Sequence, residues 1–345
     1  MTTQPSAMAF EVSPDRVATS TPERRGLDRD GVRLLVVRPS GIEHRRFRDL
    51  PDVLHAGDLL VINTSGTLPA AVDAAGRAGP VHVSTVLDDG SWVIELRRVD
   101  GRGPDRSLAP GHRIALPGGV QLAVIEPYPR AGVEQARLWR ARPATPVDLV
   151  GYLARYGRPI TYGYLDGRYP LTAYQTVYAT VPGSAEMPSA GRPFSEGLLV
   201  QLIARGITIA PVVLHAGVSS TEAHEPPFPE RYSVPSSTAR LVASARAAGS
   251  RVVAVGTTVV RALESVATLN GTVRAGHGWT DLVLGPHRPA RVVNGIISGF
   301  HEPGASHLML LEAIAGRELV RSSYQAALDH GYLWHEFGDS TVFLP

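Results

Sequence analysis

The sequence contains neither cysteine nor lysine, and each absence excludes classes of chemistry. Without cysteine there are no disulfides, thiolate nucleophiles, iron–sulfur clusters or cysteine-based zinc sites. Without lysine there is no Schiff base to pyridoxal phosphate and no phosphate-binding lysine of a P-loop. The sequence also lacks an apolar run of about 18 residues and a basic-then-apolar leader, so we expect a cytoplasmic protein with no membrane contact.

The overall composition is typical of a globular protein. The chain has 345 residues, of which 43% are hydrophobic and 19% are charged. This length predicts about two domains. All 34 basic residues are arginine, and the formal net charge of +2 is too small to indicate nucleic-acid binding by itself. An anionic partner therefore has to be bound by local arginine patches.

Short apolar runs divide the chain into two kinds of structure. Residues 32–38 and 59–63 are branched, apolar and bounded by turn residues, which is typical of buried strands. Between residues 76 and 144, strand-like runs alternate with turn clusters, which predicts a small antiparallel β-barrel. Later in the chain, strands alternate with helices. We predict an α/β fold with a mixed, mostly parallel sheet domain, residues 1–72 and 150–345, and an inserted β-barrel domain, residues 73–149.

The strongest local pattern is VVAVGTTVVRALE at residues 252–264. A branched strand ends at the sequence GTT and a helix follows, so backbone N–H groups and hydroxyls converge on an anionic or ribose-like ligand. Arg261 and Glu264 lie about one helical turn apart on one face of that helix. The alternative is an ordinary capped turn with a surface ion pair. The spacing differs from G-x-G-x-x-G, which disfavours a dinucleotide site.

A second candidate is the loop PSAGRPFS at residues 188–195, just before a predicted helix. Its small residues allow the backbone to approach a ligand, and Ser195 is a suitable helix cap. A plain loop with an N-cap explains the same residues equally well.

Three of the twelve histidines lie where sheet proteins often place reactive groups. His215 ends a predicted strand, His301 follows another, and His224 lies in a proline-rich loop. His224 and His301 are followed by Glu225 and Glu302, but neighbours on a strand face opposite sides. The histidines lack the H-x-x-x-H and H-x-H spacings of metal ligands, so we expect no metal site.

Arginines and tyrosines are also candidates for contact with a nucleic acid. The cluster EHRRFR at residues 43–48 and the pair Arg97 and Arg98 could bind phosphate, although alone such clusters are more typical of solvated faces. A tyrosine-rich region could stack against bases or simply cover the core. Its members are Tyr162, Tyr164, Tyr169, Tyr174 and Tyr178.

Several segments together resemble one family, the S-adenosylmethionine:tRNA ribosyltransferase-isomerases of queuosine biosynthesis (QueA family). They occur in the family's order across nearly the whole chain. The segments are HRRFRDLPDVLHAGDLLVIN (44–63), YQTVY (174–178), PSAGRPFS (188–195), VLHAGV (213–218), RVVAVGTTVVRALESVA (251–267), GWTD (278–281), GFHEPGASHLMLLEAIAGRE (299–318) and YLWHEFGD (332–339).

The resemblance implies an α/β domain with an inserted β-barrel and a defined reaction. In that reaction the ribosyl part of S-adenosylmethionine moves onto the aminomethyl group of a 7-deazaguanine in tRNA, and adenine and methionine are released. The product is epoxyqueuosine. Removal of a proton beside the sulfonium requires a base, departure of adenine requires an acid, and other groups must hold the ribose hydroxyls. The resemblance implies S-adenosylmethionine as substrate, with tRNA bound through arginine patches, and no metal.

On this basis we expect four catalytic candidates and nine substrate-binding residues. The histidines are candidates for the base, and the carboxylates can bind ribose hydroxyls or orient an imidazole. The catalytic candidates are His215, His301, Asp281 and Glu264. The substrate-binding candidates are Asn63, Ser189, Ala190, Gly191, Phe194, Gly256, Thr257, Thr258 and Arg261.

The chain also departs from the family pattern, and we expect the changed positions to face the ligands. The pattern Asn-Asp-Thr-Arg-Val-x-Pro-Ala-Arg has lost its Asp and both Arg, at Thr64, Gly66 and Ala71, and a family histidine is replaced by Pro193. Two further family stretches are changed. Gly-Leu-Gly-Thr-Phe reads Gly217-Val218-Ser219-Ser220-Thr221, and Asn-Phe-His-Leu-Pro reads Gly299-Phe300-His301-Glu302-Pro303. Two alternatives therefore stay open. One is a paralogue that cleaves S-adenosylmethionine or transfers part of it to a small molecule, and the other is a non-catalytic binding module.

Overall fold

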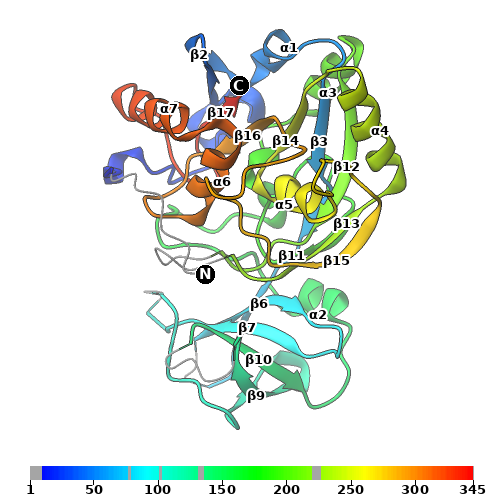
Figure 1. Ribbon diagram of the computed structural model, residues 1–345. Helices are drawn as coiled ribbons and strands as arrows, with labels where there is room; N and C mark the ends of the chain where they lie inside the picture. Colours follow the sequence, from blue (N-terminus) through cyan, green and yellow to red (C-terminus); the bar gives the residue numbers. More distant parts are fainter. Residues whose placement is uncertain (1–9, 77–78, 101–102, 131–135, 220–226, 345) are drawn as a thin grey trace.

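The protein is described here by a computed structural model that covers residues 10–76, 79–100, 103–130, 136–219 and 227–344. Figure 1 shows a large sheet flanked by helices and a smaller sheet below it. This arrangement confirms the predicted α/β fold. The division into domains at residues 72/73 and 149/150 stays a prediction.

The large sheet is mixed, with strand order β15-β13-β12-β3-β14-β16-β17-β1-β2. Parallel pairing joins β12, β3, β14 and β16, and also joins β17 to β1. The remaining pairings are antiparallel. The strands are β1 (Arg33–Arg38), β2 (Gly41–Arg46), β3 (Leu59–Asn63), β12 (Thr208–Leu214), β13 (Glu230–Val234), β14 (Val252–Val255), β15 (Gly276–Thr280), β16 (Gly295–Gly299) and β17 (Ser340–Phe343).

Helices cover both faces of this sheet, which explains why its central strands are continuous apolar runs. In β1, Leu35 and Val37 pack into one core, while Leu34 and Val36 pack into a second core on the opposite face. The helices are α1 (Leu50–Val53), α2 (Leu149–Tyr156), α3 (Glu196–Ala204), α4 (Ser236–Ala247), α5 (Thr257–Ser265), α6 (Ser306–Ala315) and α7 (Arg317–Asp329). Short 3₁₀ turns cover Pro14–Arg16, Glu23–Arg25, Arg29–Gly31, Phe47–Asp49, Pro117–Gly119, Leu171–Tyr174 and Ser189–Gly191.

The smaller sheet is curled and fully antiparallel, with strand order β5-β6-β7-β10-β9-β8. Its core also takes in Tyr152 and Leu153 of α2, and Ala185 and Val218 from segments near the large sheet. The strands are β5 (Ala71–Asp73), β6 (Pro80–Val86), β7 (Trp92–Leu96), β8 (Arg113–Ala115), β9 (Gln121–Pro127) and β10 (Leu138–Pro143).

A short parallel pair, β4 (Ser65–Thr67) and β11 (Val181–Ser184), lies between the two sheets. The chain passes directly from the end of β3 through β4 into β5. The loops that follow β3, β12, β14 and β16 therefore gather at one edge of the large sheet, facing the smaller sheet. No helix in the described part of the chain is long and apolar enough to cross a membrane.

Candidate functional site

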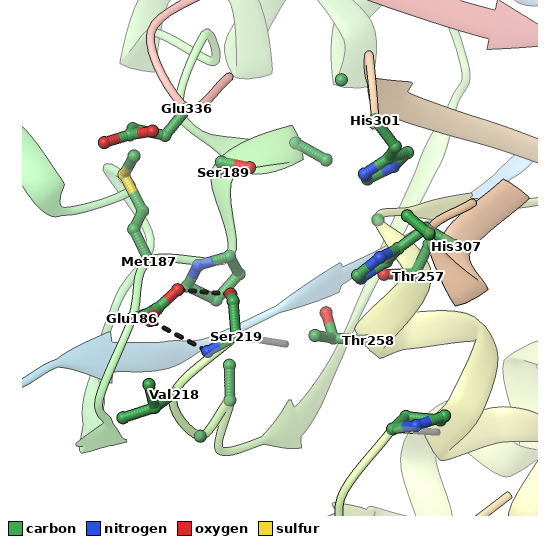
Figure 2. A pocket seen from close by; sticks show the side chains of 18 of the residues that line it. Glu186, Met187, Ser189, Val218, Ser219, Thr257, Thr258, His301, His307 and Glu336 are labelled. Atoms are coloured by element: carbon green, nitrogen blue, oxygen red, sulfur yellow. Dashed lines mark hydrogen bonds between the residues drawn. The ribbon is translucent and has the colours of Figure 1, made fainter. Parts of the chain in front are cut away.

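A cavity of about 500 Å³ opens at this edge of the large sheet. Its walls come from the loops after β14 and β16, the segment before α3, and the chain around β11. Figure 2 shows its histidines, threonines and glutamates pointing toward a common space. Seven of the residues expected from the sequence line it: Ser189, Ala190, Gly256, Thr257, Thr258, Arg261 and His301.

The two loops of small residues meet in the wall of this cavity. Gly256 has φ 90° and precedes the first residue of α5. A Cβ on Gly256 would lie 3.3 Å from the Cβ of Ala190, so both residues must be small for the loops to touch. Asn63 lies buried beneath the turn and donates from Nδ2 to Thr258 Oγ1 at 3.2 Å. Asn63 therefore orients a cavity hydroxyl without lining the cavity.

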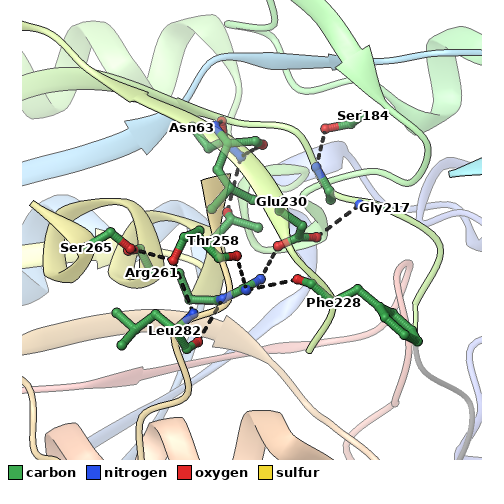
Figure 3. A network of polar contacts seen from close by, with 12 residues as sticks. Asn63, Ser184, Gly217, Phe228, Glu230, Thr258, Arg261, Ser265 and Leu282 are labelled. Carbon is green, nitrogen blue, oxygen red and sulfur yellow. Dashed lines mark hydrogen bonds and ion pairs between the residues drawn. The ribbon is translucent and has the colours of Figure 1, made fainter. Parts of the chain in front are cut away.

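Arg261 lines the cavity, but all three of its guanidinium nitrogens bond to protein groups (Figure 3). It forms an ion pair with Glu230, whose other oxygen accepts from the backbone N–H of Gly217 at 3.0 Å. Burial raises the pKa of Glu230. Arg261 also donates to the carbonyl oxygens of Phe228, Thr280 and Leu282 at 3.1, 2.9 and 3.2 Å. This network ties α5 to β13 and to the end of β15.

His301 and His307 form a stacked pair on one side of the cavity. Their ring centroids are 4.4 Å apart and their planes differ by 6°. Burial, followed by the neighbouring His307, lowers the pKa of His301 well below its ordinary value. Burial and the charge of Arg261 lower the pKa of His307 to about 4. Both imidazoles are therefore neutral near pH 7, and His301 Nε2 lies 2.9 Å from Ser298 Oγ.

His215 lies beside β4 and not in the cavity wall. Its Nδ1 is 2.7 Å from Ser65 Oγ, which is 2.6 Å from Ser184 Oγ. A Cβ on Gly183 would come within 2.4 Å of the imidazole ring, so the ring is tightly enclosed. Burial and the charge of Arg231 lower the pKa of His215. This hydrogen-bonded chain joins β12 to the β4–β11 pair.

Four other expected residues also lie away from the cavity. Glu264 is buried and accepts hydrogen bonds from the backbone N–H groups of residues 291–293 at 2.8 to 3.1 Å. Asp281 is exposed. Phe194 is fully buried and packs edge-on against Phe47. Gly191 is buried, and a Cβ there would lie 2.1 Å from the Tyr178 hydroxyl oxygen.

The departures from the family pattern form two groups, and one group faces the cavity as we expected. The cavity wall includes changed residues of the stretches 217–221 and 299–303, namely Val218, Ser219, Gly299 and Glu302. Four other departures do not face it. Gly66, Ala71 and Pro193 are buried, and Thr64 donates from Oγ1 to the carbonyl oxygen of Val212 at 3.3 Å. Since none of these four is among the described lining residues, the changes in the cavity wall are those of the other two stretches. The sequence misled here because position within a motif does not reveal which way a side chain points.

Several cavity residues were missed by the sequence analysis. His307 and Glu336 lie in the segments 299–318 and 332–339 of the resemblance but carried no assigned role, and Glu186 is an isolated carboxylate outside those segments. Tyr162, Tyr164 and Tyr174 line the cavity and were recognised only as part of an aromatic region. His335 occurs in the closing segment of the resemblance and carried no assigned role. The useful signal was the density of aromatic and acidic residues, not their spacing.

Metal ligation has no support in the described ranges, where no group of three His, Asp or Glu side chains is arranged to hold an ion. The candidates His224 and Glu225 lie outside the described residues, as do Ser220 and Thr221. In the cavity, the described carboxylates bond to tyrosines, to a histidine or to an arginine. These contacts do not favour a metal ion there.

Comparison with known proteins gives one consistent result. The family model described as "Queuosine biosynthesis protein" matches residues 6–343. An S-adenosylmethionine:tRNA ribosyltransferase-isomerase from Heliobacterium modesticaldum is 36% identical, covering 97% of this chain and 98% of the relative. One from Thermus thermophilus is also 36% identical, with 98% and 99% coverage.

A solved structure agrees with the sequence relatives. The crystal structure of an S-adenosylmethionine tRNA ribosyltransferase from Thermotoga maritima aligns with a TM-score of 0.54 and 27% identity. The alignment covers 97% of this chain and 99% of that one. Both the sequence and the fold therefore match over nearly the full length, and the chain belongs to the queuosine biosynthesis protein family.

Proposed function

We propose that this protein is an S-adenosylmethionine-dependent transferase-isomerase that forms epoxyqueuosine in tRNA. It moves the ribosyl part of S-adenosylmethionine onto the aminomethyl group of a 7-aminomethyl-7-deazaguanine, and adenine and methionine leave. The observation that carries this proposal is the near-complete coverage of relatives that bear this activity in their names. The same relatives support tRNA modification over the alternative of cleavage or transfer to a small molecule.

The cavity holds candidates for two of the groups that this reaction needs, a base and partners for the ribose hydroxyls. S-adenosylmethionine is a substrate here, held beside the turn of residues 256–258, where the hydroxyls of Thr257 and Thr258 suit ribose hydroxyls. His301 acts as the base that removes the proton beside the sulfonium, because a neutral imidazole can accept a proton. The reaction as proposed uses no metal.

Residues away from the cavity support it indirectly. His215 holds β4 against β12 through Ser65 and Ser184. Glu264 fixes the loop before β16, and Asn63 orients Thr258. We assign these three residues to positioning, and we assign Asp281, which is exposed, no contact with the reacting groups.

The tRNA partner needs a basic surface, and β2, the outermost strand beyond β17 and β1, provides one. Arg45, Arg46 and His44 are exposed and line an open pocket together with Arg33 and His330. Register places Arg46 opposite Arg33, at the cavity edge of the sheet. We assign this surface, the β2 patch, to tRNA phosphates. Since tRNA is its substrate, the protein acts in the cytoplasm.

Arg97 is less suited to phosphate binding, whereas Arg98 pairs with an exposed carboxylate, as Arg45 of the β2 patch pairs with Glu43. The Arg97 side chain is largely buried and bonds to Glu95 at 3.1 Å, and Arg98 bonds to Asp100 at 3.0 Å. A guanidinium already committed to a buried carboxylate is not free to bind an external anion.

Adenine release tests the proposed function. The protein is incubated with S-adenosylmethionine and one of three additions: precursor tRNA carrying the aminomethyl base, the same tRNA without that base, or no RNA. We expect adenine and methionine in equal amounts only with precursor tRNA. Adenine release that is independent of RNA would support the small-molecule alternative and contradict the proposal.

A further inference from the structure

Three aromatic rings form a continuous stack along one wall of the cavity. Tyr162 and Tyr164 have centroids 5.9 Å apart, and Tyr164 and His335 have centroids 4.3 Å apart. The planes differ by 15° in both pairs. All three residues line the cavity. Such a stack is rigid, so groups bonded to its edges are held in fixed positions.

Each ring of the stack binds a different glutamate. The Tyr162 hydroxyl donates to Glu186, and the Tyr164 hydroxyl donates to Glu336. His335 Nε2 lies 3.0 Å from Glu302 Oε1. The three carboxylates also line the cavity. In Figure 2, Glu186 and Glu336 lie on the side of the cavity opposite His301 and His307.

The charges in this cavity do not balance. Arg261 is the single arginine among the described lining residues, and Glu230 already neutralises it. His301 and His307 are neutral near pH 7 because burial lowers the pKa of each. Neither Glu186 nor Glu336 forms an ion pair with a described cation, and burial, together with the nearby charge of Glu336, raises the pKa of Glu186. A partly buried carboxylate without a cation is costly, so a cationic ligand would be strongly favoured here.

A second observation points to a missing ligand in the same place. Tyr174 lines the cavity and is only 4% exposed. Thr161 is a polar neighbour of the Tyr174 hydroxyl, but this hydroxyl makes no hydrogen bond of ordinary geometry within the described structure. A buried hydroxyl without a partner is rare in folded proteins and marks a place where a ligand or water supplies the bond.

We infer that Glu186 and Glu336 bind a primary ammonium group of a substrate. This inference rests on the proposed function, whose substrates carry two such groups: the α-amino group of S-adenosylmethionine and the aminomethyl group of the acceptor base. An ammonium has three donors and can bond to two carboxylates at once. Glu186 accepts from the backbone N–H of Ser219 at 2.9 Å, which holds this carboxylate in place. The Tyr164 hydroxyl bonds to Glu336 Oε2, so Glu336 Oε1 can accept a hydrogen bond from the ammonium group.

The test compares variants with ligands that lack the ammonium group. Glu336→Gln and Glu186→Gln keep the size of the side chain and remove its charge. Glu318→Gln is the matched control, because that residue is on the exposed surface of α7. Binding of S-adenosylmethionine and of its analogue without the α-amino group is measured by calorimetry. Turnover is measured with precursor tRNA. Binding is compared between precursor tRNA and tRNA whose base carries a nitrile in place of the aminomethyl group, because the nitrile has no amine to accept the ribosyl group.

If the methionine ammonium is bound, each cavity variant weakens S-adenosylmethionine binding by at least about tenfold and leaves binding of the analogue unchanged. If the acceptor ammonium is bound, S-adenosylmethionine binding is unchanged and the KM for precursor tRNA rises by a similar factor. The wild-type protein should bind the ligand that carries the ammonium group more tightly than the matching ligand without it. This comparison needs no variant, so it remains a test even if a variant fails to fold.

Two results would overturn the inference. One is that the wild-type protein is active, but Glu186→Gln and Glu336→Gln behave like Glu318→Gln with both ligand pairs. This result would leave the proposed function standing. The other is a wild-type protein that neither binds S-adenosylmethionine nor releases adenine, which would contradict the proposed function as well.

Discussion

At the scale of single residues, access to the cavity decides which histidine can serve as a base. His301 and His307 have lowered pKa values because the cavity walls disfavour the charged imidazolium. A histidine that stays neutral near pH 7 can accept a proton. Burial lowers the pKa of His215 as well, but its ring is enclosed by the chain at Gly183 and does not line the cavity. Access to the cavity therefore separates the base from a structural histidine.

Replacing His301 by alanine should lower kcat by at least about a hundredfold, which is the usual effect of losing a general base. The control is His277→Ala, since His277 is exposed on β15. Steady-state turnover and urea unfolding are measured for both variants. A folded His301→Ala protein with kcat close to that of the control would exclude His301 as the base.

The lowered pKa of His307 also makes stability depend on pH. The folded state holds this group neutral down to about pH 4, whereas the unfolded state protonates it below about 6.5. The unfolded state thus binds more protons in this window, so the free energy of unfolding falls as pH is lowered through it.

We expect this one group to cost roughly 2 kcal/mol between pH 7 and pH 4. The free energy of unfolding of wild type and of His307→Gln is measured by urea titration across this range. The variant should lose less stability on acidification than the wild type. Parallel pH curves for the two proteins would contradict the shifted pKa.

At the scale of elements, the site depends on contacts between segments far apart in the sequence. Helix α5 begins at the GTT turn, and Arg261 fastens it to β13 through Glu230. Glu264, one turn later, fastens it to the loop before β16. The helix is thus fixed along its length, and the turn at its start is held rigid in the cavity wall.

Arg261→Met should lower the free energy of unfolding by about 3–5 kcal/mol, because it leaves Glu230 as a partly buried charge without a partner. Glu230→Gln removes that charge. We therefore expect the double variant to lose less stability than the sum of the two single variants, as measured by urea unfolding. Additive losses would show that the two residues are not coupled.

Much of the fold and part of the site could be predicted from the sequence. The buried runs of β3 and β14 and the GTT turn are local patterns, and local patterns are readable. Glu264 was misplaced because its partners, residues 291–293, lie in a loop that the sequence does not connect to it. Glu186 and Glu336 belong to different segments, and only the fold of the chain between them brings them to one cavity.

At the scale of the whole molecule, the small sheet closes the cavity edge of the large one (Figure 1). Asp88, in the turn between β6 and β7, forms an ion pair with Arg231 and accepts from Trp279 Nε1 at 3.0 Å. Ser84 Oγ accepts from the backbone N–H of Val218 at 3.0 Å. These interactions fix the two sheets together, and the β2 patch lies at the same edge of the large sheet.

The β2 patch predicts a salt-dependent affinity for tRNA. Arg45→Ala and Arg46→Ala should weaken tRNA binding, and each should lower the slope of log K against log salt by about one if its guanidinium neutralises one phosphate. Binding of S-adenosylmethionine should not change. Arg205→Ala is the control, because Arg205 follows the end of α3 and pairs with Asp52, away from the cavity. The measurement is filter binding at several salt concentrations. If Arg45→Ala and Arg46→Ala behaved like Arg205→Ala, the assignment of the β2 patch to tRNA would be wrong.

The most direct measurement of the central claim follows the ribosyl carbons. S-adenosylmethionine labelled with ¹³C in its ribose is incubated with the protein and precursor tRNA, and the digested nucleosides are analysed by mass spectrometry. The account predicts epoxyqueuosine that carries the full ribose label, with one adenine released for each nucleoside formed. Unlabelled tRNA in a reaction that consumes S-adenosylmethionine would contradict it.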